Sequence, residues 1–596
     1  MKKINLLYIL GLLFIGTGFQ GCSDILESSP KDTLTDPSVW GNKDAVNAYL
    51  GKLYDQMQTE DFGYMVFDDG GFPSEVTDEA VRSYTWGRIN NPIIPDDDFG
   101  WWGYGALREV NSFIQKIKTA PVSDAEKNRY EAESRFIRAY HFFAMVKRYG
   151  GIPIITEPQD FTGDNMEELQ VPRNTEKEVY EFIKSEIDEI VSILPEEWDS
   201  ANKFRATKYS AYALKSRAML YAGSIATYGK VQYDGLVGIN KADREYFFTE
   251  CKKASDAIIN SGKFELYNKK EDKEQNFQAL FLDKDLHSEA IFTKAFSAPD
   301  RGHSWDYYNA PQSFKVDYGC VINPTLQLVE EFDYIDGSEG SLKTTDANGD
   351  PIKFDSPYDL FKDKDPRLLA SIMVPFSPWQ NDIMEARRGI INGDKIITSS
   401  NLTEHYGEGD KKITITGKDG ILESTDVTKT GFYVKKYMDP VNRVNYSRSE
   451  VNWMVFRYAE VLLNYAEAAA ELNKDTDKGL TYINQVRERA GVAPLTTLSI
   501  EKVRKERKVE LAFENHRWWD IRRWRVADNI LNNYQARALY PYLVWEDGKY
   551  PSEMKYIFKK DKAPKETRTF NPKLYYVKIP AGQITTNPKL LQNPGY

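Results

Sequence analysis

The stretch AESRFIRAYHFFAMVKRYGGIPII (residues 132–155) decides the fold class of this chain. Its apolar side chains recur at spacings of four and three, the pattern of one face of an α-helix: Ala132, Phe136, Ala139, Phe143 and Val146. The helix is expected to end at Gly150-Gly151, with Pro153 just beyond, because glycine and then proline are the usual C-terminal signals. The stretch therefore predicts a helix with one apolar face and favours a mainly α fold.

The same spacing of apolar residues predicts separate helices before and after this stretch. Thr207 is expected to be the N-cap of another helix. Its apolar face carries Ala211, Leu214, Ala218 and Tyr221. Further helices are expected over about 104–118, 176–193 and 244–260.

A second helical block is expected over about 451–525. The four-three spacing returns in Tyr458, Leu462, Tyr465, Ala469 and Leu472. Two more helices are expected over Gly479–Ala490 and Ile500–Trp524. Small alanine side chains in this block let helices pack closely, which favours antiparallel helix pairs stacked as in tetratricopeptide repeats, although the strict repeat period is absent.

Three segments lack the helical pattern: about 60–103, 262–450 and 526–596. Gly, Pro and Asp are frequent there, with short β-prone runs such as Lys412–Thr416. Long irregular segments on a rigid scaffold are where binding surfaces usually lie. We therefore expect one domain over 41–596, with a helical scaffold over about 41–260 and 451–525. Long loops and a few short strands over about 262–450 are expected to form the ligand face.

Residues 1–21 are predicted to be a secretory signal peptide. Met1-Lys2-Lys3 is cationic, and Ile4–Ile15 is almost wholly apolar, with small residues after it. The apolar run is shorter than the roughly 20 residues that span a bilayer. The chain is therefore expected to be exported.

The predicted cleavage point lies directly before Cys22, which is followed by Ser23-Asp24. This order is typical of a bacterial lipoprotein, although Phe19-Gln20 depart from the usual pattern. Cys22 is expected to be the acylated N-terminus that anchors the chain in a membrane, with residues 22–40 as a flexible tether. The alternative is an ordinary secreted protein cut near the same point.

Composition narrows the class of partner. The net charge of −11 argues against nucleic acid or anionic lipid as the main partner, because both attract clustered Lys and Arg. Besides Cys22, only Cys251 and Cys320 are present, which is too few for a disulfide framework in so long a chain. A single disulfide between these two cysteines is the alternative to two free thiols. The 12 Trp and 37 Tyr can supply flat surfaces for stacking as well as core.

Seven stretches together resemble the SusD/RagB family of outer-membrane lipoproteins. They occur in family order over essentially the whole chain after the signal peptide. They are AESRFIRAYHFFAMVKRYGGIPII (132–155), FRATKYSAYALKSRAMLYAG (204–223), DPRLLASI (365–372), TGFYVKKYMDP (430–440), FRYAEVLLNYAEAAAEL (456–472), RKERKVELAFENHRWWDIRRW (504–524) and IPAGQITTNPKLLQNPGY (579–596). The resemblance implies tetratricopeptide-like helix pairs with irregular segments as the ligand face.

The resemblance also implies a role without catalysis. The chain would capture a glycan at the outer face of the outer membrane and deliver it to a SusC-like TonB-dependent transporter. Within the family, capture of peptides or glycopeptides is the alternative. A lipid-anchored glycan hydrolase is an alternative of a different class, which predicts two carboxyl groups facing each other across a cleft. A third alternative, a scaffold for protein assembly alone, predicts buried Trp86 and Trp305 and no pocket.

The charged residues in 504–524 are expected to be structural. Opposite charges lie three or four residues apart, so we expect an ion-paired helix packed by Leu511, Phe513, Trp518 and Trp519. Arg457, Glu460 and Glu467 are interpreted in the same way.

No pattern of residues points to catalysis, a cofactor or a metal ion. The sequence has no zinc-protease, nucleophile-elbow, P-loop or dinucleotide-binding motif, and its five histidines are scattered. Asp346–Asp350 begins like a calcium loop, but Pro351 and Pro357 stand where such a loop needs glycine and glutamate. A plain turn is therefore favoured there.

Aromatic residues in the irregular segments are the candidate binding residues, because sugars stack on Trp and Tyr faces while polar side chains bond their hydroxyls. The first group is Asp78, Arg82, Tyr84, Trp86, Arg88 and Asn90. The second is Arg301, Trp305, Asp306, Tyr307 and Tyr308, and Trp379 is a third candidate. The alternative for each ring is packing of its loop onto the scaffold.

Overall fold

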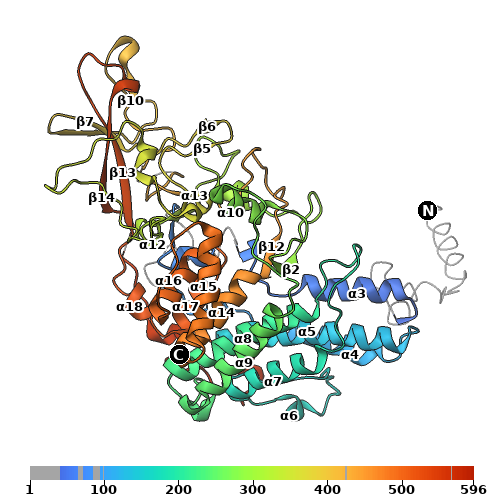
Figure 1. Ribbon diagram of the computed structural model, residues 1–596. Helices are drawn as coiled ribbons and strands as arrows, with labels where there is room; N and C mark the ends of the chain where they lie inside the picture. Colours follow the sequence, from blue (N-terminus) through green and yellow to red (C-terminus); the bar gives the residue numbers. More distant parts are fainter. Residues whose placement is uncertain (1–39, 65–71, 85–93, 98, 423–425, 566) are drawn as a thin grey trace, which may run out of the picture.

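The computed structural model describes residues 40–64, 72–84, 94–97, 99–422, 426–565 and 567–596. The fold is mainly α, as the sequence predicted, with a stack of helices below and a small sheet projecting from it at the upper left of Figure 1. In the described residues, no helix is both long enough and apolar enough to cross a membrane.

The first helical block forms a continuous stack. It contains α3 (Lys43–Asp55), α4 (Tyr104–Ile117), α5 (Asp124–Tyr149), α7 (Glu176–Ile190), α8 (Lys208–Tyr228) and α9 (Arg244–Ile259). Along this stack α4 packs on α5, α5 on α7, α7 on α8 and α8 on α9. Apart from α3, which was not individually predicted, these helices confirm those predicted from the sequence.

The predicted helix ends are also confirmed. Helix α5 ends at Gly150, whose φ of 72° is a conformation that glycine adopts readily. A side chain at this position would collide with Leu236 and Val237, so the glycine also permits close packing. Thr207 caps α8 as expected, because its hydroxyl accepts a hydrogen bond from the backbone N–H of Ser210 at 3.2 Å.

The second block continues the stack, because α14 (Tyr458–Leu472) packs on both α9 and α15 (Thr476–Ala490). The single helix predicted over Ile500–Trp524 was wrong. The chain instead forms α16 (Ile500–Glu510) and α17 (Arg517–Arg523). Phe513 and Asn515 between them both have a φ of 62°, which is incompatible with a continuous right-handed helix.

Ion pairs do stabilise this region, but most of their partners differ from the predicted ones. Arg523 and Asp520 are a pair three residues apart, whereas Arg507, Glu510 and Glu514 pair mostly with other elements. The single side chain of Arg457 forms ion pairs with Glu289, Glu510 and Glu514 at 2.7–2.8 Å, and all four side chains are buried. The segment is therefore part of a buried ionic network between elements, since buried charges need partners on every side.

The projecting sheet has four strands in the order β14–β13–β7–β8. They are β7 (Gly389–Asn392), β8 (Lys395–Thr398), β13 (Arg537–Val544) and β14 (Tyr556–Lys562). β13 pairs antiparallel with β14 and parallel with β7, with Leu543 opposite Ile390. The prediction that 526–596 is irregular throughout was therefore wrong, and Pro541 inside β13 explains part of the error, because proline is unusual within a strand.

A two-stranded sheet of β2 (Ala290–Lys294) and β12 (Trp453–Arg457) lies above the helical stack and leads directly into α14. The remaining helices are α6 (Met166–Leu169), α10 (Lys273–Leu282), α11 (Trp305–Asn309), α12 (Leu326–Glu331), α13 (Pro366–Ser371), α18 (Ala527–Leu531) and α19 (Ala581–Thr586). The remaining strands are β1 (Ala80–Arg82), β3 (Ile322–Pro324), β4 (Ile372–Met373), β5 (Pro378–Trp379), β6 (Asp382–Ile383), β9 (His405–Tyr406), β10 (Ile413–Thr414) and β11 (Tyr433–Val434).

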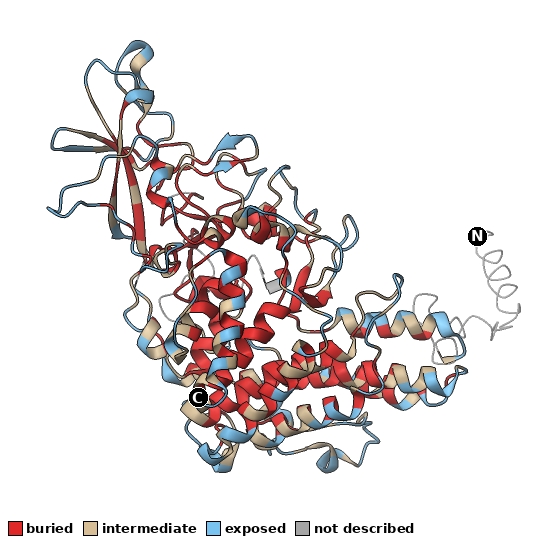
Figure 2. Ribbon diagram, viewed as in Figure 1, coloured by how far each residue is buried: buried red, intermediate tan, exposed pale blue. Residues whose placement is uncertain are grey.

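The core runs through the middle of the helical stack and up to the short strands, as the red segments of Figure 2 show. Exposed residues lie mainly on the outer helix faces and on the projecting sheet. Cys251 and Cys320 are both buried and free, so no disulfide joins them.

Candidate functional site: a pocket with a tyrosine rim

A pocket of about 820 Å³ lies where the end of α3 meets β2, and it is called the main pocket here. One wall comes from residues 51–63 and another from β2 and the segment that follows it, residues 295–304. Phe204, Tyr308, Tyr446 and Ser447 complete the lining. The pocket is thus assembled from segments that are far apart in the sequence.

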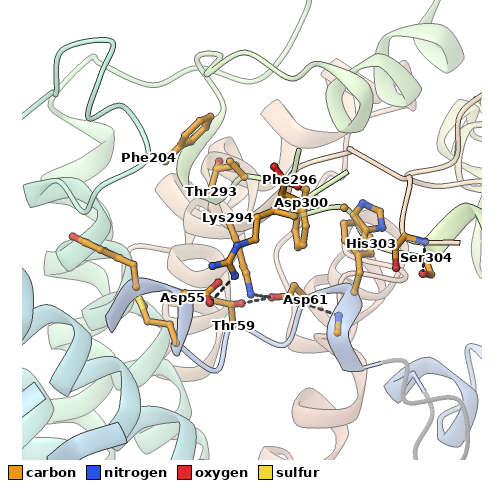
Figure 3. Close-up of a pocket in the computed structure, with 18 of the residues that line it drawn as sticks. Asp55, Thr59, Asp61, Phe204, Thr293, Lys294, Phe296, Asp300, His303 and Ser304 are labelled. Atoms are coloured by element: carbon orange, nitrogen blue, oxygen red, sulfur yellow. Dashed lines mark hydrogen bonds and ion pairs between the residues drawn. The ribbon is translucent and has the colours of Figure 1, made fainter. Parts of the chain in front are cut away.

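The polar centre of the main pocket is Asp61. Its carboxylate accepts hydrogen bonds from the Thr59 hydroxyl at 2.6 Å and from the Gly63 backbone N–H at 2.7 Å, and Lys294 of β2 lies 2.6 Å away (Figure 3). Burial would raise the pKa of Asp61, but the Lys294 ammonium and these hydrogen bonds outweigh it and lower the pKa. Asp61 is therefore held as a carboxylate and does not serve as a proton donor near neutral pH.

A second ion pair lies at the rim. Nη1 of Arg301 is 2.8 Å from Oδ2 of Asp55, and both side chains are largely exposed. An exposed pair of this kind exchanges readily with other partners, because water screens it. Both side chains can therefore offer hydrogen bonds to a ligand that enters the main pocket.

His303 forms part of the floor in a fixed, neutral state. Its ring stacks on Phe62 with centroids 3.9 Å apart. Nδ1 accepts a hydrogen bond from the Trp305 backbone N–H at 3.2 Å, which leaves Nε2 to donate to the Val451 carbonyl at 3.0 Å. Burial lowers the pKa of His303 to about 4.

Four tyrosines gather at the edge of the main pocket and are called the tyrosine rim here: Tyr307, Tyr308, Tyr318 and Tyr446. The ring centroid of Tyr307 lies 5.3 Å from that of Tyr308 and 5.5 Å from that of Tyr446. Tyr446 is 59% exposed and Tyr318 is 38% exposed. These rings offer an apolar surface with hydroxyl groups beside the polar centre of the main pocket.

The structure places the predicted site residues in very different surroundings. Trp86, Arg88, Asn90 and Cys22 lie outside the described residues. Tyr307 and Tyr308, by contrast, lie in the tyrosine rim, and Tyr308 also lines the main pocket.

Arg301 also lines the main pocket, whereas the other predicted site residues are buried. Asp78 is bound by Arg517 and Lys508 at 2.8 Å, and the Tyr84 hydroxyl donates to the Gly319 carbonyl at 2.9 Å. Trp305 is only 1% exposed and Trp379 only 4%. The faces of these rings are covered by protein in this conformation, so they offer no surface for stacking.

Trp305 nevertheless packs behind a residue that lines the main pocket. Its ring packs against Phe62, which lines the pocket, with centroids 5.3 Å apart. Its indole N–H donates to the Lys436 carbonyl at 2.9 Å, which fixes the start of α11 and so the position of the tyrosine rim.

Sequence reasoning missed Asp61, Lys294, Phe204, Tyr318 and Tyr446. Tyr446 lies in an irregular segment of the kind singled out as a ligand face, but nothing in the sequence places it against Tyr307. Asp61 and Lys294 carried no local signal either, because they are 233 positions apart in the sequence and only the tertiary fold brings them together. In the described residues, no three His, Cys, Asp or Glu side chains are grouped so as to hold a metal ion.

Two family models match the chain. One is described as the SusD family and matches residues 288–596. The other is described as starch-binding associating with outer membrane and matches residues 26–220. The two matches cover the regions that supply the walls of the main pocket.

Curated relatives match over most of their length. SusD-like protein P2 of Formosa agariphila is 24% identical over 567 residues, which are 89% of this chain and 92% of that protein. Starch-binding protein SusD of Bacteroides thetaiotaomicron is 23% identical over 510 residues, which are 82% of this chain and 76% of that protein.

Solved structures share the fold. A SusD-like protein of Bacteroides fragilis superposes with a TM-score of 0.71 at 25% identity, covering 95% of this chain and all of that one. A laminarin-binding SusD-like protein superposes with a TM-score of 0.56 at 19% identity, covering 94% of this chain and all of that one.

Proposed function

Because this chain belongs to the SusD family, we propose that it captures an oligosaccharide or polysaccharide in the main pocket, without breaking any bond in it. The observation that carries the proposal is the tyrosine rim beside Asp61 and Lys294. Stacking rings next to fixed polar groups is the arrangement that a sugar requires, since each ring of a glycan has apolar C–H faces and a hydroxyl-bearing edge. The name of the starch-binding relative supports the same class of ligand.

The lack of catalysis is part of the proposal. A hydrolase of the two-carboxylate type needs one carboxyl group that stays protonated near neutral pH. Asp61, the most buried carboxylate of the main pocket, has a lowered pKa because Lys294 and two hydrogen bonds stabilise its charge. This supports binding over hydrolysis.

We further propose that the chain is anchored in the outer membrane through acylated Cys22, facing outward, and passes its glycan to a SusC-like TonB-dependent transporter. The support is the signal-peptide pattern before Cys22 and the family to which the chain belongs. A tethered binding protein raises the ligand concentration at its partner, so even weak binding is useful. Cys22→Ser is expected to move the protein from the membrane fraction to the soluble fraction.

Retardation in native gels tests the binding proposal. Residues 23–596, which include every described residue, are run in gels cast with amylopectin, laminarin, xylan, mannan or pectin. Retardation by one polysaccharide, lost in a Tyr446→Ala, Tyr308→Ala double variant, is the expected result. Retardation that persists in this variant would place the site elsewhere. No retardation by any polysaccharide, together with binding to a glycopeptide column, would replace glycan capture by peptide capture.

A further inference from the structure

A second, smaller pocket adjoins the main pocket at Phe204, and it is called the side pocket here. Its volume is about 190 Å³. Phe204, Phe292 and Thr293 line both pockets. Figure 3 shows the Phe204 ring at the end of the main pocket that lies away from His303 and Ser304. The two pockets are therefore neighbours that share part of their lining.

Strand β2 runs along both pockets. Ala290 and Ile291 line the side pocket, and Lys294 lines the main pocket. A strand rises by about 3.3 Å per residue, so these contacts extend over about 13 Å. An extended ligand that follows β2 thus passes from one pocket into the other without leaving the protein surface.

The side pocket has the same kind of lining as the main pocket. The rings of Trp198, Phe204 and Phe264 supply apolar surface, and Glu196 and Lys203 supply polar groups. The Trp198 indole N–H donates to the Ala206 carbonyl at 2.9 Å, which fixes its ring. Beside both pockets, the Thr293 hydroxyl is buried and has no hydrogen-bond partner among the described residues.

We propose that the side pocket is a second subsite for the same glycan chain, and that Phe204 is the junction between the two subsites. This inference rests on the proposed function. The protein then recognises a longer run of sugar units than the main pocket alone holds, with the chain lying along β2 from the tyrosine rim towards Trp198. Length selection follows, because only a long chain makes the contacts of both pockets.

Titration calorimetry with oligosaccharides of graded length tests this inference. The series is prepared by partial hydrolysis of the polysaccharide that retards the wild-type protein in native gels. Phe264 lines the side pocket but not the main pocket, so Phe264→Ala is expected to weaken binding of the longest oligosaccharides about tenfold, the equivalent of one lost aromatic contact, and of the shortest less than twofold. Tyr446→Ala is expected to weaken all lengths alike, because the tyrosine rim belongs to the main pocket.

Two more variants complete the test. Phe161→Ala removes an equally large ring that is 60% exposed and lines neither pocket, and it should bind every length as wild type does. Leu286→Arg places a bulky group in the side pocket at a position 41% exposed, and it should reproduce the length-dependent loss of Phe264→Ala. Equal weakening of short and long oligosaccharides by Phe264→Ala, or none, would overturn the second subsite. If the wild-type protein binds no polysaccharide at all, the proposed function itself fails, which is a different result.

Discussion

Oδ2 of Asp61 lies 2.6 Å from Nζ of Lys294, and this ion pair joins the segment after α3 to the end of β2. The two residues are 233 positions apart in the chain, and together they form the polar centre of the main pocket. The contact therefore links the stability of the fold to the shape of the candidate site.

Asp61→Asn should destabilise the protein by about 1–2 kcal/mol at pH 7, because it leaves Lys294 without its charged partner. The pKa of Asp61 is lowered in the folded state, so the ionised side chain stabilises the folded protein at pH values above the ordinary carboxyl pKa of about 3.9. This stabilisation is lost as the pH falls below about 3.9 and through the lower pKa of the folded state. Urea denaturation at a series of pH values measures both effects. The difference between wild type and variant should narrow below about pH 4, and a difference that stays constant there would contradict the ion-pair explanation.

Tyr446→Ala should weaken glycan binding about tenfold, the equivalent of about 1.4 kcal/mol, with little change in the free energy of unfolding. The reason is that the Tyr446 ring is largely exposed and packs against the rings of Tyr307 and Tyr308 at the surface. Calorimetric titration with the retarding glycan gives the affinity, and urea denaturation gives the stability. Tyr246→Ala, at an exposed position on α9 outside both pockets, is the matched control. Equal affinity of both variants would remove the tyrosine rim from the site.

Arg367→Met should destabilise the protein by about 3–5 kcal/mol, because it removes the counter-charge of buried Asp365 and one of the counter-charges of buried Glu506 and Glu510. The Arg367 guanidinium lies within 2.6–2.8 Å of Asp365, Glu506 and Glu510, and all of these groups are buried. Arg108→Met removes an exposed pair with Asp160 instead and should cost less than about 1 kcal/mol. Similar losses in the two variants, measured by urea denaturation, would show that burial does not govern these pairs.

The contribution of Asp306, under the tyrosine rim, to the free energy of unfolding should fall as the pH rises from about 4 to 6. Burial raises the pKa of Asp306 to about 6, while the unfolded carboxyl group loses its proton near 3.9. Between these values this carboxyl group is more protonated in the folded state than in the unfolded state, so its own contribution to stability falls as the pH rises.

The isosteric Asp306→Asn cannot ionise, so its stability relative to wild type should increase over this interval by at most about 2–3 kcal/mol. The free energies of unfolding of both proteins at pH 4, 5, 6 and 7 provide the measurement. A relative stability that is the same at every pH would mean that Asp306 titrates normally.

The helical scaffold was predictable from the sequence because its signals are local. The apolar spacing from Ala132 to Val146 and the stop at Gly150 specify α5 without reference to any other segment. The break between α16 and α17 was not predictable in this way. There the carboxylates of Glu510 and Glu514 bind Arg457 from another element, and such partners are invisible to an argument from helical spacing.

The candidate site was predictable only in part for the same reason. Residues 301–308 were predicted as a binding segment, but which ring faces outward depends on packing: Trp305 turns into the core and Tyr307 does not. Tyr446 and Asp61 join the site through contacts with residues that are far away in the sequence, which no motif encodes. The sequence therefore indicated the region of the site better than its residues.

Apart from Phe204, the walls of the main pocket come from three stretches, residues 51–63, 292–308 and 446–447. A ligand that contacts all three stretches holds them together in the folded state, so the Tm of the protein should rise when the right ligand is present. Binding at about a hundred times the dissociation constant adds about 2.7 kcal/mol to the stability of the folded state. Heating the protein in the presence of many glycans in turn would thus reveal its ligand without any prior assumption about which sugar it carries.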